Sequence, residues 1–119
     1  MLVGPRFALN GLAVSVMLAF GSGAYALPTG GAVSAGSANI ASGAGNMTIN
    51  QSSQNVAINW QSFSIGKTEA VQFVQPNSSS VALNRVLGAD ASSIMGSLSA
   101  NGKVFLVNPN GILPQSPRL

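Results

Sequence analysis

The sequence contains neither cysteine nor histidine among its 119 residues. The absence of cysteine excludes a disulfide framework and a thiolate metal site, and the absence of histidine removes the commonest general base and metal ligand. Charged residues are also scarce, at 6% of the chain, against about 25% in an average globular domain. Polar character comes instead from Ser, Asn, Gln and Gly, a mixture that favours strands and turns over surface helices.

The scarcity of charge argues against two functional classes. Nucleic-acid binding needs a concentrated basic face, whereas the five Lys and Arg residues are scattered along the chain. A polysaccharide lyase or hydrolase needs several carboxylates, often with a metal ion, and Glu69 and Asp90 are the only acids. We therefore expect no enzymatic activity, no cofactor, no nucleic-acid partner and no small-molecule ligand.

Residues 1–26 have the pattern of a secretory signal peptide. Arg6 provides a short basic region, residues 11–20 form an apolar core, and the Ala-Tyr-Ala sequence at 24–26 is a small-x-small cleavage site. The apolar run is shorter than the roughly 20 residues that span a bilayer. We expect export by the general secretion machinery and cleavage after Ala26 by signal peptidase; an uncleaved N-terminal anchor is the alternative.

After this segment, apolar and polar residues alternate in short runs separated by Asn-, Gly-, Ser- and Pro-rich turns. No segment keeps a helical period over ten residues or more, which predicts an all-β fold. Residues 27–45 are nearly all small and predict a flexible lead-in, a weak edge strand or a capping segment. Residues 46–113 carry the strands, and residues 91–98 are the one helix-like or irregular stretch. The expected core residues are Ile58, Trp60, Phe63, Ile65, Val71, Phe73, Leu83, Val86, Val104 and Leu106.

Two groups of apolar residues give more specific expectations. The continuous run Val104–Val107 predicts a strand that is covered on both faces. The aromatic residues that follow the signal peptide are expected to fill the core, with a sugar-binding platform as the alternative. These residues are Trp60, Phe63, Phe73 and Phe105.

The recurrence of strand and turn about every ten residues suits either a β-sandwich or a β-solenoid. The low charge and the many Asn residues near strand ends favour the solenoid, in which turns stack on turns. Stacked Asn side chains can hydrogen-bond along such a column, and Asn tolerates the left-handed conformation that a tight corner requires. The residues alone leave the two folds nearly balanced.

Two stretches have the composition of turns. In Asn108-Pro109-Asn110-Gly111, the Asn108 side chain can bond the backbone two residues on, Pro109 sets φ at about −65°, and Gly111 suits the last position of a type I turn. Gln75-Pro76-Asn77-Ser78 is a possible second turn, with Gln in the first position.

The segment from Asn50 to Gly111 resembles the secretion domain of two-partner-secretion exoproteins, the family of filamentous-haemagglutinin-like adhesins, haemolysins and contact-dependent inhibition proteins. This secretion domain is also called the haemagglutination activity domain. The segment is most similar to the branch of the family typified by the high-molecular-weight adhesins. The resemblance rests on five stretches in order: Ile58–Gly66 (INWQSFSIG), Val71–Phe73 (VQF), Leu83–Gly88 (LNRVLG), Ser93–Leu98 (SIMGSL) and Ala100–Gly111 (ANGKVFLVNPNG).

The resemblance implies a right-handed parallel β-helix with a capped N-terminal end. It also implies a function in the periplasm, where the soluble domains of a dedicated outer-membrane β-barrel transporter recognise the domain and start its passage to the cell surface. Folding of the exoprotein that follows would be nucleated by this domain. The family is known by the turn at 108–111, which either contacts the transporter or only shapes a corner. A short secreted surface adhesin or haemagglutinin-like binding protein is the alternative function.

Residues 114–119 depart from this pattern. Pro114 and Pro117 stand where a strand should run, and proline cannot donate to a central ladder. Because family members continue for further rungs, we expect residues 46–113 to be a partial β-helix. A frameshift, a truncated gene or a fragment would explain the tail; a genuine short product that acts as a decoy for the transporter is the alternative.

Overall fold

The computed structural model describes residues 26–114, and the regular structure in this range consists of β-strands. The predicted signal peptide up to residue 25 and residues 115–119 of the predicted tail lie outside the described residues. Within the described range, no helix is long and apolar enough to cross a membrane. The prediction of an all-β fold is confirmed. The strands are β3 (Ala32–Ala35), β4 (Ala38–Gly43), β5 (Asn46–Gln51), β6 (Asn55–Trp60), β7 (Ala70–Val74), β8 (Val81–Val86), β9 (Ser92–Ser93), β10 (Ser97–Ala100), β11 (Lys103–Val107) and β12 (Ile112–Leu113).

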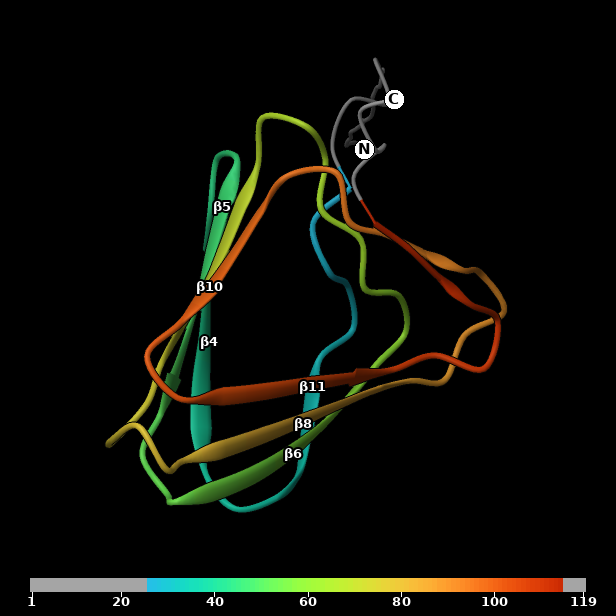
Figure 1. The fold of residues 1–119 in the computed structure, drawn as a ribbon. Helices are drawn as coiled ribbons and strands as arrows, with labels where there is room; N and C mark the ends of the chain where they lie inside the picture. Colours follow the sequence, from blue (N-terminus) through green and yellow to red (C-terminus); the bar gives the residue numbers. More distant parts are fainter. Residues whose placement is uncertain (1–25, 115–119) are drawn as a thin grey trace, which may run out of the picture.

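The strands wind around a triangular cross-section that has three faces (Figure 1). The first face is the sheet β10-β7-β5-β4, and the second is the sheet β11-β8-β6-β3. The third face holds the short pair β12-β9 and a parallel bridge between Ile65 and Ile94. Strands from successive turns of the chain, here called rungs, pair in parallel on every face. This is the parallel β-helix that the family resemblance implies.

Parallel pairing places equivalent residues of successive rungs above one another. On the first face, Met47 pairs with Val71 and Val71 with Leu98, while Ile49 pairs with Phe73. Because side chains alternate across a strand, each such stack lies either inside or outside the β-helix along its whole length. The inward stacks therefore build a continuous apolar column.

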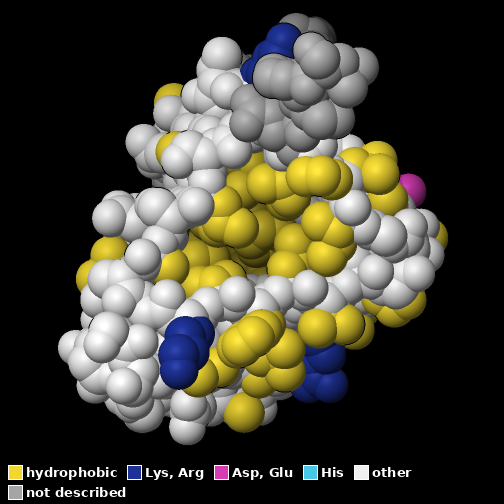
Figure 2. Space-filling view, viewed as in Figure 1, with side chains coloured by type: hydrophobic (Ala, Val, Ile, Leu, Met, Phe, Trp, Pro, Cys, Tyr) yellow, Lys and Arg dark blue, Asp and Glu magenta, His cyan; other side chains and the backbone are white. Residues whose placement is uncertain are grey.

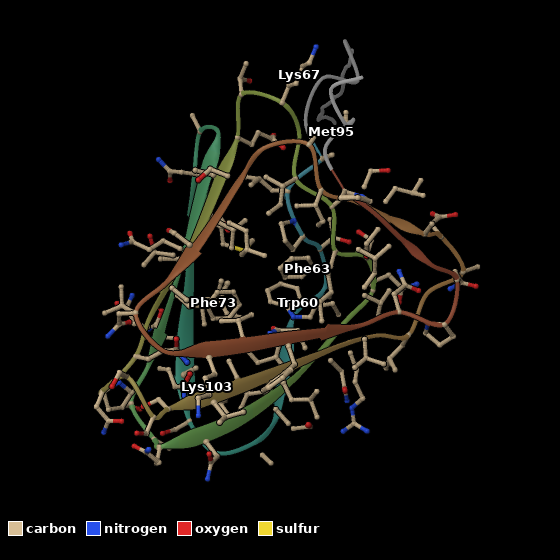
Figure 3. The ribbon with its side chains drawn as sticks, in the orientation of Figure 1. Trp60, Phe63, Lys67, Phe73, Met95 and Lys103 are labelled. Carbon is tan, nitrogen blue, oxygen red and sulfur yellow. The ribbon has the colours of Figure 1, made fainter. Side chains whose placement is uncertain are left out.

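The core of this column contains an aromatic pair. The Trp60 and Phe63 rings pack edge to face, with 5.3 Å between centroids and 80° between planes, a favoured geometry for aromatic contacts. Both rings and that of Phe73 lie in the interior (Figure 3). The predicted core residues that are buried are Ile58, Trp60, Phe63, Ile65, Val71, Phe73 and Val86, and Val104 and Leu106 are partly buried against them.

Leu83 does not belong to the core. The inward residues of β8 are Ala82, Asn84 and Val86, so Leu83 lies on the outer face and is only half-buried. The prediction that Leu83 lies in the core is wrong, whereas that for Val86 is confirmed. Two residues that are three apart in a regular strand point to opposite faces, so only one of them can face inward. The polar Asn84 is accommodated inside because its Oδ1 accepts a 2.8 Å hydrogen bond from Trp60 Nε1.

The apolar run in β11 is covered on one face only. Val104 and Leu106 pack against the core, whereas Phe105 is 52% exposed and Val107 is 46% exposed. Among the described strands, only β8 makes extensive contact with β11, and it does so edge to edge. The predictions that both faces of this strand are covered and that Phe105 fills the core are therefore wrong.

Residues 91–98, expected to be helix-like or irregular, are largely extended and pair with neighbouring rungs. Ser92 N donates to Gly111 O at 3.0 Å, and Ile94 N donates to Leu113 O at 2.8 Å. Local composition misleads here, because pairing between distant rungs decides the backbone conformation of this stretch.

Residues 27–45 close the N-terminal end of the β-helix. β3 and β4 pair antiparallel with β6 and β5, unlike the rungs that follow, and the register of β3 shifts between Val33 and Ala35. An irregular edge of this kind hinders the addition of another strand. Gly31 lies against the Trp60 indole, where a Cβ atom would come within 2.6 Å of the ring. Small residues are thus required because the cap packs closely over the core.

The inward position of Val86, the last residue of β8, can be tested against Leu87, which follows the strand. We expect Val86→Ala to lower the free energy of unfolding by about 2 kcal/mol, because Val86 is 4% exposed and truncation leaves a cavity. Leu87→Ala is the control, with an expected change within about 0.5 kcal/mol, because Leu87 is 67% exposed. Urea unfolding of both variants measures the difference, and equal losses would contradict the assignment.

Candidate functional site

A column of amide side chains lines the corner between the first and second faces. Gln51 and Gln75 are each 5% exposed, and Gln75 Nε2 donates to Gln51 Oε1 at 3.0 Å. Gln75 and Asn101 form two hydrogen bonds. The backbone N–H of Gln75 donates to Asn101 Oδ1 at 2.7 Å, and Asn101 Nδ2 donates to the backbone carbonyl of Gln75 at 2.8 Å. Gly102 N also donates to Gln75 Oε1, at 2.8 Å. Polar side chains thus join three successive rungs at this corner.

A second amide pair lies on the exposed side of the same corner. Gln54 Nε2 donates to Asn77 Oδ1 at 3.3 Å, and Asn77 Nδ2 donates to Gln54 Oε1 at 3.0 Å. Asn77 Oδ1 also accepts from the backbone N–H of Ser79 at 2.9 Å, which closes a local turn. In the predicted second turn, therefore, Gln75 and Asn77 connect rungs, and Pro76 and Ser78 are exposed.

Sequence reasoning expected stacked Asn side chains near strand ends, and Asn101 was among those residues, but it missed two glutamines of this corner, Gln51 and Gln54. A repeat at rung length would have revealed them, because Gln51 and Gln75 are 24 residues apart and Gln75 and Asn101 are 26 apart. Trp60 and its partner Asn84 are also 24 residues apart. Amide residues at this spacing indicate stacked corners in a solenoid with rungs of this length.

The stretch Asn108 to Gly111 contains the two turn bonds that its composition indicates. Asn108 Oδ1 accepts from the backbone N–H of Asn110 at 2.9 Å, and Gly111 N donates to the Asn108 carbonyl at 3.0 Å. Gly111 has φ +107°, in the region that favours glycine. Pro109 and Asn110 are exposed at the tip of the corner.

Both asparagines of this turn also attach it to the preceding rung. Asn108 Nδ2 donates to the Asp90 carbonyl at 3.0 Å and to Ser92 Oγ at 2.9 Å. Asn110 Nδ2 donates to the Gly88 carbonyl at 2.9 Å. The amide groups are occupied within the molecule, and the turn holds the third face in place.

An apolar patch lies on the outer side of the second face. Phe105 stacks on Leu83 there, and Val107 pairs with Arg85. Lys103, at the start of β11, is exposed like Arg85. Along this side of the molecule, Lys and Arg side chains flank apolar ones (Figure 2). We call Leu83, Phe105 and Val107, with Arg85 and Lys103 beside them, the outer-face patch.

The two acids do not form a cluster. Glu69 is buried at 2% exposure, and Asp90 is exposed. Residues 26–114 contain no group of three or more His, Cys, Asp or Glu side chains that could hold a metal ion. The features that the described residues present for a function are therefore the stacked rungs and the exposed outer-face patch.

The whole described range matches a known family. Residues 24–116 match the family model of the TPS secretion domain, the secretion domain of two-partner secretion. The chain belongs to this family. Its structure is similar to the crystal structure of the HMW1 secretion domain from Haemophilus influenzae, with a TM-score of 0.70 and 39% sequence identity, over 73% of this chain and 23% of that chain. The predicted family and its parallel β-helix fold are confirmed.

The secretion domain is also similar to two heme/hemopexin-binding proteins of Haemophilus influenzae. One is 42% identical over 111 residues, which cover 90% of this chain and 12% of the relative. The other is 55% identical over 67 residues, which cover 56% of this chain and 7% of the relative. The chain therefore spans about an eighth of the length of these relatives or less.

The corner at Asn108 is open to a direct test. We expect Asn108→Ala to lower the free energy of unfolding by about 2–3 kcal/mol, because it removes bonds to Asp90, Ser92 and Asn110. Pro109→Ala is the control, with an expected loss below about 1 kcal/mol, because Pro109 is exposed. Hydrogen exchange at the Ser92 amide, which donates to Gly111 O, should accelerate only in the first variant. Unchanged exchange in Asn108→Ala would contradict the anchoring role.

The amide column provides a second test. We expect Gln75→Ala to cost about 3 kcal/mol of unfolding free energy, because it leaves Gln51 Oε1 and Gly102 N without their buried partner. Gln72→Ala makes the same chemical change at an exposed position of β7, where the expected effect is within about 0.5 kcal/mol. Thermal and urea unfolding of the two variants give the comparison. Similar stability of the two would show that the column contributes little.

Proposed function

We propose that this secretion domain directs its chain to a partner outer-membrane transporter by binding the transporter's periplasmic domains through the outer-face patch. Membership of the TPS family supports the class of partner, since proteins of two-partner secretion cross the outer membrane to the cell surface. The observation that carries the proposed contact is the exposure of Phe105 and Val107, at 52% and 46%. The fold does not require large apolar side chains on this outer face.

The outer-face patch has the composition of a protein interface. Apolar and aromatic side chains at the centre with polar groups at the rim are typical of such surfaces, and aromatic residues dominate their energetics. Arg85 and Lys103 lie at the rim of the patch and are exposed. They would favour a transporter surface with an apolar groove and acidic residues around it, because complementary charge accelerates encounter.

The turn at 108–111 has a structural role in this proposal. Its Asn108 and Asn110 amides are bonded within the domain, which supports shaping of the corner over direct contact with the transporter. Alterations of the turn would then impair secretion by disturbing the third face.

The domain would also nucleate folding of the exoprotein in one direction. The antiparallel strands β3 and β4 cap the N-terminal end, whereas β10 and β11 are the last strands of parallel sheets. At that end the interior shows a hollow lined by apolar side chains (Figure 2). Because a solenoid folds by adding rungs to an existing edge, further rungs would add at β10, β11 and β12 only.

Binding to the transporter can be tested with one substitution at two sites. We expect Val107→Ser to weaken binding to the purified periplasmic domains of the cognate transporter by at least about tenfold. Val74→Ser is the matched control, because Val74 is 41% exposed on the other sheet, against 46% for Val107. Binding is measured by titration calorimetry, and circular dichroism establishes that both variants fold. Equal affinities of the two variants would overturn the assignment of the patch.

The alternative function, a short secreted surface adhesin or haemagglutinin-like binding protein, gives a different result in the same experiment. An adhesin of this kind would not bind the transporter in the wild-type form. Tight wild-type binding would therefore favour the secretion role, whereas its absence would favour the adhesin. The two roles proposed for this domain, transporter binding and nucleation of folding, require no catalysed reaction.

A further inference from the structure

Glu69 is a buried carboxylate whose described partners are backbone N–H groups. It is 2% exposed and lies just before β7. Its Oε1 accepts from Gly66 N at 2.7 Å and from Ala26 N at 3.0 Å, and its Oε2 accepts from Ala26 N at 3.2 Å. Lys67 is exposed and points outward (Figure 3). A buried carboxylate that is not neutralised by a cation is costly, so its partners matter for the fold.

The partner Ala26 lies at the predicted cleavage site. Signal peptidase would hydrolyse the bond between Ala26 and Leu27. Water supplies the second oxygen of the new Ala26 carboxylate and two of the hydrogens of the new Leu27 α-ammonium. Ala26 then leaves with the signal peptide, and Glu69 loses the bonds that both of its oxygens accept from Ala26 N. Leu27 becomes the first residue of the cleaved chain, and its side chain packs against the core cluster.

We propose that Glu69 is the binding site for the α-ammonium group of Leu27, which cleavage creates, and that the N-terminal cap docks fully only in the cleaved chain. Ala26 N lies 3.0 Å from Glu69 Oε1, and successive residues span at most about 3.6 Å of chain, so Leu27 N lies within about 7 Å of the carboxylate. An ammonium carries a full charge and three donors, and its bonds to a carboxylate are about twice as strong as neutral ones.

The chain after Leu27 is held in a position that suits this contact. Thr29 N donates to the Ser62 carbonyl at 3.0 Å, and Gln61 N donates to the Thr29 carbonyl at 2.9 Å. These bonds fix the segment two residues after the new terminus. The ammonium of Leu27 therefore stays near Glu69, and removal of the signal peptide would replace a neutral donor by a charged one inside the cap.

The experiment compares two forms of the chain from Leu27 to Leu119, one with a free α-amine and one selectively acetylated there. A fusion whose protease leaves Leu27 first supplies the free form, and mass spectrometry verifies the acetylation. We expect acetylation to lower Tm by roughly 5 °C and to reduce hydrogen-exchange protection of the Thr29 and Gln61 amides by about tenfold or more. Unchanged Tm and protection would overturn the proposal.

Two variants show whether Glu69 is the group that responds. In Glu69→Gln, acetylation should no longer change Tm, whereas Asp90→Asn, an exposed acid, should keep the full effect. An equal effect of acetylation in Glu69→Gln and wild type would overturn the proposal. If Glu69→Gln does not fold, the exchange measurement on the wild-type chain decides the question by itself.

The inference rests on cleavage after Ala26 and is independent of transporter binding. Mass spectrometry of the exported protein identifies its first residue. A first residue other than Leu27 would overturn the proposal for the exported protein, whatever the transporter titration shows. Loss of transporter binding with an intact acetylation effect would overturn only the proposed function.

Discussion

Parallel stacking of equivalent residues is the constraint on which the rest of this structure depends. Each strand pairs with its counterpart from the next rung, so that like positions meet. Apolar positions such as Met47 and Val71 build the core, and amide positions such as Gln51 and Gln75 build the corner. The amide column is needed because tight corners carry backbone groups that the sheets do not satisfy, and buried polar groups must find partners.

The same constraint makes the two ends of the domain different. A parallel rung presents an edge that another parallel rung can join, so the first rung needs a cap. Antiparallel β3 and β4 provide it, with Gly31 packed on Trp60 and the buried Glu69 holding Ala26. The cap is therefore the part of the described chain with antiparallel pairing and a register shift, and the buried acid Glu69 lies beside the residues that precede it.

The outer side of the second face shows what the fold leaves unconstrained. Asn84 occupies an inward position with Trp60 as its partner, while Leu83 and Phe105 stack outside. A polar residue inside and an aromatic residue outside are the reverse of what packing alone would favour. The inward exception is explained by a hydrogen bond. The outward one has no explanation within the described fold, which is why it supports an interface.

The sequence by itself determined the all-β class, the alternation of strands and turns, the bonds of the turn at Asn108 and, through five motifs, the family. These features depend on local spacing and on residue types that act within a few positions. Only the tertiary structure decided that Leu83 and Phe105 face outward and that Glu69 holds Ala26. Such placements depend on partners far along the chain: 24 residues separate Trp60 from Asn84, and 43 separate Ala26 from Glu69. A strand's own pattern cannot reveal its inner face when a distant hydrogen bond allows a polar residue inside.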